Sequence, residues 1–331
     1  MRCPHCQSEQ TVKNGRVKLQ DQSVQQRYLC QACAKRFNER TNTPMARLRT
    51  PALVVSAAIN VRTEGLGVRA TGRSFGKSHS TIIRWEHRVA QQESQWSPPA
   101  PDGADVTLEG DEVYTRIGEN LPPQRSPGWT IHFIERESRY WVDAQAGQKT
   151  TELFEQGTQK AWEWAKPADF IRWFTDGERR YGTALWQLAS VHLKAGEVHP
   201  DYGQRKVWRQ GLEVAMKIKG SQGHKRVEWV KVEHPFTALN PVHEVHANHN
   251  EAQNSALRRR ASAYRRRQNL YAKRVEGLQR VLDVQCLVHN WVRPHWGLGK
   301  HRTPAIAMGY CSRPISMDEI LTSRGFHYFT P

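Results

Sequence analysis

The sequence predicts a multidomain α/β protein, and three observations lead to this prediction. Two Cys-x-x-Cys pairs lie within the first 33 residues. A proline-rich stretch, Ser97-Pro98-Pro99-Ala100-Pro101, follows a short helical region and is typical of a linker between domains. Beyond it, strand-like segments alternate with helical ones, as expected of a domain built on a mixed sheet. At 331 residues the chain is long enough for two or three domains.

The charge is unevenly distributed along the chain. The net charge is +17, from 49 Lys and Arg against 32 Asp and Glu, which favours a polyanionic partner. Residues 1–100 and 251–331 are basic, whereas residues 101–250 carry 19 basic and 21 acidic side chains. No apolar run approaches the roughly 18 residues of a membrane span, and the N-terminus has no apolar secretory segment. We therefore expect a cytoplasmic, nucleoid-associated protein with no membrane partner.

The first element is expected to be a zinc ribbon over residues 1–40. The two Cys-x-x-Cys pairs are separated by 23 residues, close to the spacing of a structural four-thiolate zinc site. Segments 12–16 and 26–29 between the pairs read as strands. The alternative of two disulfides needs an oxidising compartment, which the missing export signal disfavours. The predicted zinc ligands are Cys3, Cys6, Cys30 and Cys33.

Residues 41–95 are predicted to form a helix-turn-helix module that binds DNA. Helices are expected at 51–59, 68–75 and 78–91, because Pro51 suits a first turn and Ser78 is a good N-cap. A glycine-containing turn before the last helix is typical of this motif. The alternative is an ordinary helical spacer. The side chains predicted to contact the duplex are Lys77, Ser80, Arg84 and Arg88. Residues 96–104 are the predicted linker.

Residues 105–285 are predicted to form the largest domain. Strands at 105–116, 129–135 and 140–145 are expected to form an antiparallel meander. The elements expected to follow are a helix at 150–165, an apolar strand at 170–175, a helix at 180–189, a strand at 227–233 and a polar helix from about 250. Asp176-Gly177 comes at the carboxyl end of the apolar strand, where α/β folds place functional side chains.

Three carboxylates occupy distinct positions in this order. Asp111 lies on the first strand, Asp176 ends the fourth, and Glu251 lies on the late helix. The order resembles an RNase H-like nucleotidyltransferase core, in which three carboxylates meet to hold two divalent ions. Such ions can activate a water or a 3′ hydroxyl and stabilise the leaving oxygen of a phosphodiester. Alternatives remain: Glu109 or Glu112 in place of Asp111, a plain turn at Asp176, and a solvated helix start at Glu251.

The late helix begins a strongly basic region. Between residues 251 and 280 there are nine basic and two acidic side chains, which suits a phosphate backbone. The alternative is a solvated face or a disordered tail. The predicted DNA contacts of this region are Asn254, Arg258, Arg259 and Arg265; the neighbouring Arg266 and Arg267 belong to the same basic run.

Three histidines precede this helix at steps of three, His243, His246 and His249. On an α-helix each step of three turns the side chain by about 60°, so one shared metal ion is disfavoured. We expect instead a loop in which His246 or His249 touches phosphate.

Together these motifs resemble a DDE transposase of the insertion-sequence-1 type. Members have an N-terminal zinc ribbon, a helix-turn-helix and an RNase H-like domain with Asp, Asp and Glu. The tail, residues 286–331, contains Asn290-x2-Arg293-Pro294-His295-x2-Leu298 and Thr303-Pro304-Ala305, similar to the end of many DDE integrases and transposases. Residues 202–241 are longer and more basic than this pattern. The other matching stretches are the cysteine pairs, Gly110-Asp111-Glu112, Thr175-Asp176-Gly177 and Glu251-x2-Asn254-x3-Arg258.

The resemblance implies an enzyme that binds terminal inverted repeats through residues 1–95, cleaves at the element ends and joins 3′ hydroxyls to target DNA. Asp111, Asp176 and Glu251 would be catalytic and hold two Mg²⁺ or Mn²⁺ ions, with a structural Zn²⁺ in the ribbon. Because two ends must be joined, a homodimer or larger assembly on double-stranded DNA is expected. The alternatives are a non-catalytic DNA-binding transcriptional regulator and a structure-selective nuclease on the same core.

Overall fold

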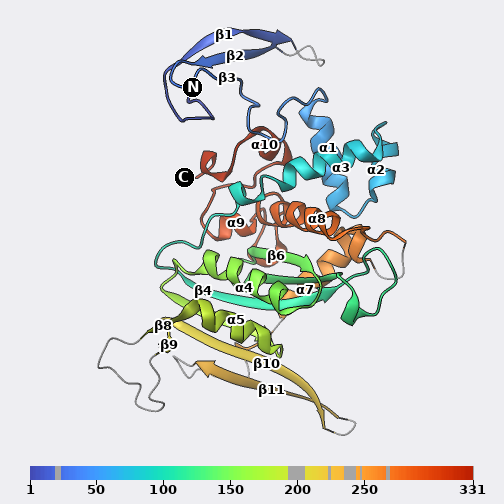
Figure 1. Cartoon of the computed structure of the whole chain (residues 1–331), viewed down its shortest axis with the longest axis vertical. Coiled ribbons are helices and arrows are strands. Elements are labelled where there is room, and N and C mark those ends of the chain that lie inside the picture. The colour runs from blue at the N-terminus through green and yellow to red at the C-terminus, as the bar shows by residue number, and fades with distance from the viewer. Residues whose placement is uncertain are drawn as a thin grey trace.

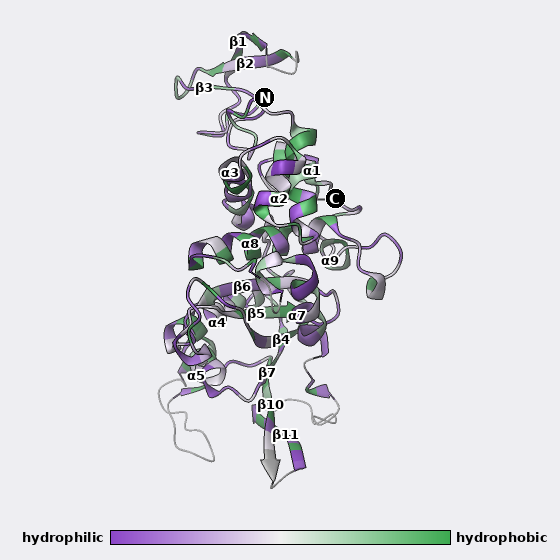
Figure 2. Ribbon diagram, turned by 90° about the vertical axis from the view of Figure 1, so that its right-hand side faces the viewer, coloured by the Kyte–Doolittle hydropathy of each residue, from purple (hydrophilic) through white to green (hydrophobic). Residues whose placement is uncertain are grey.

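The computed structural model describes residues 1–18, 24–192, 206–222, 225–234, 244–246, 248–265 and 269–330. Three parts are stacked along the long axis of the molecule: a small sheet, a group of helices, and a larger sheet covered by helices (Figure 1). A view turned by 90° shows the same stacking, with β1–β3 at one end and β10–β11 at the other (Figure 2). The fold is mixed α/β, as the sequence predicts.

The small sheet contains three antiparallel strands with the four N-terminal cysteines at one end. Its strands are β1 (Thr11–Lys18), β2 (Val24–Cys30) and β3 (Arg36–Phe37), in the order β1-β2-β3. Among its described residues the buried core consists of Cys3, Cys30 and Phe37. Tyr28 stacks on Phe37, with ring centroids 5.5 Å apart. So small an apolar core provides little stability by itself, which makes the cysteine cluster important to this sheet.

Three helices follow, α1 (Ala52–Thr63), α2 (Val68–Ser74) and α3 (His79–Ala90). Ser78 caps α3, because its hydroxyl accepts the Thr81 amide at 3.2 Å. Gly72 lets the turn approach α2: a Cβ at this position would lie 2.6 Å from the Lys77 carbonyl oxygen. Buried Ile59, Ile82, Trp85 and Val89 hold the helices together, and the short helix η1 (Glu93–Trp96) leads to the linker.

The larger sheet has six strands in the order β11-β10-β7-β4-β5-β6. Three antiparallel strands come first in the chain, and β7 then pairs in parallel with β4 on the side away from β5. β10 continues in parallel beside β7 and folds back as antiparallel β11. The strands are β4 (Asp105–Tyr114), β5 (Trp129–Glu135), β6 (Trp141–Gly147), β7 (Phe170–Asp176), β10 (Leu212–Gln222) and β11 (Lys225–His234).

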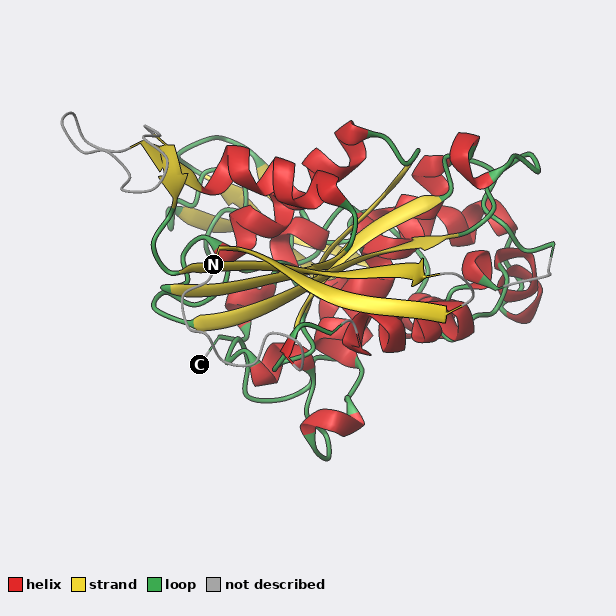
Figure 3. Cartoon of the chain, turned by 90° about the horizontal axis from the view of Figure 1, so that it is seen from below, coloured by secondary structure: helices red, strands yellow, loops and turns green. Residues whose placement is uncertain are grey.

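Helices cover both faces of this twisted sheet (Figure 3). α4 (Thr151–Ala165) and α5 (Arg179–Ala189) pack together on one face, whereas α7 (Asn248–Arg260) and α8 (Val275–Leu287) cover the other. The buried aromatic rings of Phe133, Trp173 and Tyr181 fill the space beneath α4 and α5. The shorter elements are η2 (Pro123–Arg125), β8 (Ser190–His192), β9 (Lys206–Trp208) and η3 (Ser262–Tyr264).

The C-terminal tail returns to the N-terminal helices and fastens them to the larger domain. Trp291 is fully buried, and its indole N–H donates to the Trp96 carbonyl oxygen at 2.8 Å. The Met45 amide donates to the Leu321 carbonyl at 3.3 Å. The tail elements are the π-helical η4 (Val288–Val292), η5 (Trp296–Leu298), α9 (Pro304–Ala307), α10 (Met317–Thr322) and η6 (Phe326–Tyr328).

Most predicted elements of the larger domain coincide with observed ones, and the region after α5 is the main difference. The expected strand at 227–233 lies within β11, but its partner β10 was not expected. Within the described residues, no helix combines the length and apolar character needed to cross a membrane.

Candidate active site and metal-binding clusters

The register of β4 and β7 brings two predicted carboxylates together. The parallel pairing sets Gly110 opposite Thr175, so Asp111 and Asp176 follow at adjacent positions. Ligand atoms of Asp111, Glu112 and Asp176 all lie within 4.8 Å of one another, and we call these three residues the acidic cluster. Glu112, which the sequence offers only as an alternative to Asp111, is thus close to both aspartates.

Asp111 is held by hydrogen bonds from its own strand and from α7. One carboxylate oxygen accepts the Glu112 amide at 2.8 Å, and the other accepts the Asn254 side-chain amide at 2.9 Å. The Asn254 carbonyl oxygen faces His132 Nε2 at 3.0 Å, so this histidine nitrogen carries the proton. Asn254 is therefore a rigid link between buried β5 and the acidic cluster.

The other two carboxylates are held mainly from the α4–α5 side. Glu112 forms an ion pair with Lys149 and lies 3.4 Å from the Tyr181 hydroxyl, which donates to it. Asp176 accepts the Glu178 amide at 3.2 Å, immediately before α5 begins.

Both aspartates of the acidic cluster have raised pKa values. Burial raises the pKa of Asp111 to about 6, with the negative charge of Glu112 adding to the effect. Burial also raises the pKa of Asp176 to about 7, together with the charges of Glu112 and Asp111. Bound divalent cations would relieve this repulsion, and oxygen-only ligands suit Mg²⁺ or Mn²⁺. The donor set therefore fits the magnesium prediction for Asp111 and Asp176.

Glu251 lies outside the acidic cluster among the described residues. Its side chain is 61% exposed on the first turn of α7, and its carboxylate is 3.4 Å from the Lys219 ammonium. It is one helical turn from Asn254, which contacts Asp111. The positive charge of Lys219 also opposes the rise in the pKa of Asp111, so this ammonium acts on both predicted ligands.

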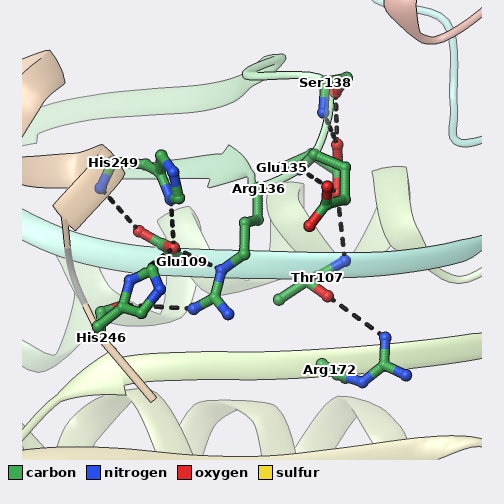
Figure 4. Close-up of polar contacts among 9 residues, drawn as sticks. Thr107, Glu109, Glu135, Arg136, Ser138, Arg172, His246 and His249 are labelled. Carbon is green, nitrogen blue, oxygen red and sulfur yellow. Dashed lines mark hydrogen bonds and ion pairs between the residues drawn. The ribbon is translucent and has the colours of Figure 1, made fainter. Parts of the chain in front are cut away.

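A second cluster is built around Glu109, which precedes Asp111 by two residues on β4. The sequence does not predict it as a metal site. Ligand atoms of Glu109, His246 and His249 lie within 4.8 Å of one another, and we call them the Glu109–histidine cluster. The buried Glu109 carboxylate lies between the two imidazoles, and the Arg136 guanidinium approaches it from the side (Figure 4). Burial opposes ionisation, but the His249 hydrogen bond and the Arg136 charge hold the pKa of Glu109 below its ordinary value. His243 lies outside the described residues.

The four N-terminal cysteines surround a common point as free thiols. Cys3 and Cys33 have sulfurs 3.7 Å apart, and Cys6 and Cys30 have sulfurs 3.5 Å apart. Sulfurs around a tetrahedral zinc, at about 2.3 Å from the metal, lie about 3.8 Å from one another. The Cys3 sulfur also accepts the His5 amide at 3.4 Å, which helps to offset thiolate charge. The geometry fits a structural metal site.

The residues predicted to contact DNA in α3 and just before it have different environments. Lys77, Ser80 and Arg84 are exposed. Arg88 instead donates to the carbonyl oxygens of Pro44 and Ala46, at 3.2 and 2.7 Å, and so fastens the segment before α1. An open pocket of about 410 Å³ lies at the start of α3, and its lining includes the basic side chains Arg69, Arg73 and Lys77.

The predicted contacts near α7 are also partly engaged within the chain. Arg259 is exposed, whereas Arg258 is half-buried and has an interaction of its own. Arg265 donates to the Arg259 carbonyl oxygen at 3.1 Å. Arg266 and Arg267 lie outside the described residues.

No protein-family model matches the sequence, and no curated protein matches it.

Proposed function

We propose that the chain is a DNA transposase that binds terminal inverted repeats, cleaves at the element ends and joins 3′ hydroxyls to target DNA. The observation that carries the proposal is the acidic cluster, which lies where β7 ends beside β4 in the middle of the sheet. A site for two-metal-ion phosphoryl transfer needs several carboxylates converging from distant parts of the chain. Asp111 and Asp176 meet this requirement.

The topology of the larger sheet supports an RNase H-like interpretation of this domain. An antiparallel β4–β5–β6 meander carries the first carboxylate on its first strand, and β7 pairs in parallel with that strand and ends in the second. A later helix, α7, crosses the same region and supplies Glu251 and Asn254. Asp111 and Asp176, which are distant in sequence, would thereby be available to one pair of metal ions.

Each side chain has a task in the proposed reaction. Asp111 and Asp176 would hold the two Mg²⁺ ions, and Asn254 keeps the Asp111 carboxylate oriented. Glu251 would complete one site after leaving its exposed pair with Lys219, which costs little because such pairs are weak in water. The ions would activate the attacking water or 3′ hydroxyl and stabilise the leaving oxygen.

Two basic regions would hold DNA in the proposed complex. Exposed Lys77 precedes α3, and exposed Ser80 and Arg84 lie in its first two turns. The second region, Arg258, Arg259 and Arg265, lies at the end of α7 or just beyond it. Because α3 packs on α8, the two regions belong to one connected body. Joining two element ends would require a dimer or larger assembly.

A strand-transfer assay tests the proposal. A short terminal-repeat duplex is incubated with target DNA and Mg²⁺ or Mn²⁺, using wild type, Asp176→Asn and the matched control Asp102→Asn, which changes an exposed acid. We expect Asp176→Asn to lose at least about a hundredfold in rate, because a metal ligand is removed, and the control to remain active.

The same assay separates the alternatives. Equal strand transfer by wild type and Asp176→Asn would overturn the metal assignment. Binding without cleavage by wild type would favour a transcriptional regulator, and cleavage without joining would favour a structure-selective nuclease.

A further inference from the structure

We infer that Glu109, His246 and His249 form a transition-metal site that binds Zn²⁺, separate from both the acidic cluster and the four cysteines. Two imidazole nitrogens and one carboxylate are a donor set that zinc accepts in tetrahedral sites with one open position. Imidazole is a poor ligand for Mg²⁺, so the two neighbouring clusters would select different ions. The inference does not depend on the proposed transposase activity.

The donor atoms are already gathered around one carboxylate. Glu109 Oε1 lies 2.7 Å from His249 Nδ1 and 3.6 Å from His246 Nδ1. The His246 Nδ1 atom is buried and makes no hydrogen bond within the described part of the chain, although it faces a carboxylate. A buried ring nitrogen left without a partner is costly, and a metal ion at this point would satisfy it.

The local backbone explains why two histidines three residues apart can converge. α7 begins at Asn248, so His246 precedes the helix and His249 lies in its first turn. The rotation of about 60° for each step of three applies only within a helix, and it does not separate these two rings. The ring centroids lie 5.5 Å apart.

Packing on both sides keeps the cluster in place. Val245, next to His246, is buried against Phe174 and Ala215. Arg136 Nε donates to Glu109 Oε1 at 2.7 Å, and Arg136 Nη2 donates to the His246 carbonyl oxygen at 3.4 Å. Arg136 thus orients the carboxylate as an outer partner, an arrangement that commonly supports metal ligands.

The proposed zinc site lies between a strand of the sheet and the first turn of a helix. Glu109 belongs to β4, whereas His249 belongs to the turn of α7 that also carries Glu251. A zinc ion shared between them would tie the start of α7 to the sheet. The zinc site and Asp111 would be about 7 Å apart, the repeat of two residues along a strand.

Metal content of the purified full-length chain tests the inference. Protein is equilibrated with Zn²⁺ alone, passed through a desalting column, and analysed for zinc per chain. We expect about two ions in wild type, one of them at the four cysteines. The double variant His246→Gln, His249→Gln should lose one ion, and the control His301→Gln, which changes an exposed histidine, should lose none.

Cobalt substitution identifies which site is lost. In wild type, Co²⁺ should give both the strong thiolate charge-transfer absorption of a cysteine site and the weaker visible bands of a nitrogen–oxygen site. The double variant should keep the first and lose the second, whereas Cys30→Ser should do the reverse. Unchanged far-ultraviolet circular dichroism shows that each variant is folded. One zinc per wild-type chain, or equal content in wild type and a folded double variant, would overturn the inference.

Discussion

Asp176 is buried beside two other carboxylates, and this environment makes its negative charge costly. Because its folded-state pKa is raised from 3.8 to about 7, the folded protein keeps a proton that the unfolded chain releases between these values. The free energy of unfolding of the metal-free protein should therefore fall as the pH rises from about 4 to about 7.

Replacing Asp176 with Asn removes this loss and keeps the oxygen that accepts the Glu178 amide. In EDTA at pH 8, we expect Asp176→Asn to be more stable than wild type by about 1–3 kcal/mol, and the difference to shrink towards pH 5. Urea unfolding at several pH values measures it. Mg²⁺ should raise the stability of wild type more than that of the variant; a variant less stable than wild type at pH 8 would contradict the expectation.

At this scale the sequence is informative about single carboxylates and much less about their partners. Asp111 and Asp176 could be selected because each has a recognisable place on a strand. The closeness of Glu112 depends on side-chain directions at the end of β4, and the His246–His249 pair depends on where α7 begins. Neither can be read from residue types alone. The basic character of α3 predicts that Arg88 contacts DNA, and it gives no sign that the Arg88 guanidinium also donates to two carbonyl oxygens.

Between helices, a buried ion pair joins α1 to α3. Glu86 accepts Arg62 Nε at 2.6 Å, with side chains 3% and 7% exposed, and Arg280 of α8 lies 3.4 Å from its other oxygen. Glu86→Gln keeps the shape but removes the negative charge that both arginines face. We expect the free energy of unfolding to fall by about 3–5 kcal/mol, measured by urea denaturation.

An exposed ion pair within one helix provides the comparison. Glu163 and Lys166, at the C-terminal end of α4, are about half exposed. Glu163→Gln should cost less than about 1 kcal/mol, because water already solvates both charges. Equal losses for Glu86→Gln and Glu163→Gln would show that burial does not determine the strength of the α1–α3 connection.

Elements with strong periodicity or clear end signals could be predicted, as α3, α4 and β7 illustrate. In the hairpin of β10 and β11, the sequence predicts β11 but not β10. β11 reads as a strand by itself, whereas β10 mixes lysines with apolar residues, since its first half pairs with β7 and its second half extends past the end of that strand. A strand that changes its surroundings midway lacks one consistent pattern.

For the whole molecule, the contact of Trp96 with Trp291 joins the N-terminal helices to the tail. Their rings meet edge to face, with centroids 5.2 Å apart, and both side chains are buried. Trp291→Ala should reduce the free energy of unfolding by about 3–5 kcal/mol, as expected for a large buried aromatic side chain, and urea denaturation provides the measurement.

Trp296 is the matched control, because it lies five positions along the same tail and is 90% exposed. Trp296→Ala should change the free energy of unfolding by no more than about 0.5 kcal/mol. If both variants lost the same stability, the tail would not be fastening the helices through Trp291.

The overall arrangement also shows why the sequence predicts the parts better than their assembly. Zinc-ligand spacing, the helical module and the α/β order are each local patterns. The return of residues 291–330 to Met45 and Trp96 depends on surfaces that exist only after the sheet has formed.

The Trp96–Trp291 contact also constrains the order in which the nascent chain can fold during translation. The two residues are separated by 195 positions. Because ribosomes add about 5–20 residues per second, Trp291 is synthesised roughly 10–40 s after Trp96. Translation therefore completes the strands of the acidic cluster before the helical module can be locked against them. The contacts of the tail with Met45 and Trp96 can form only after these strands have been made.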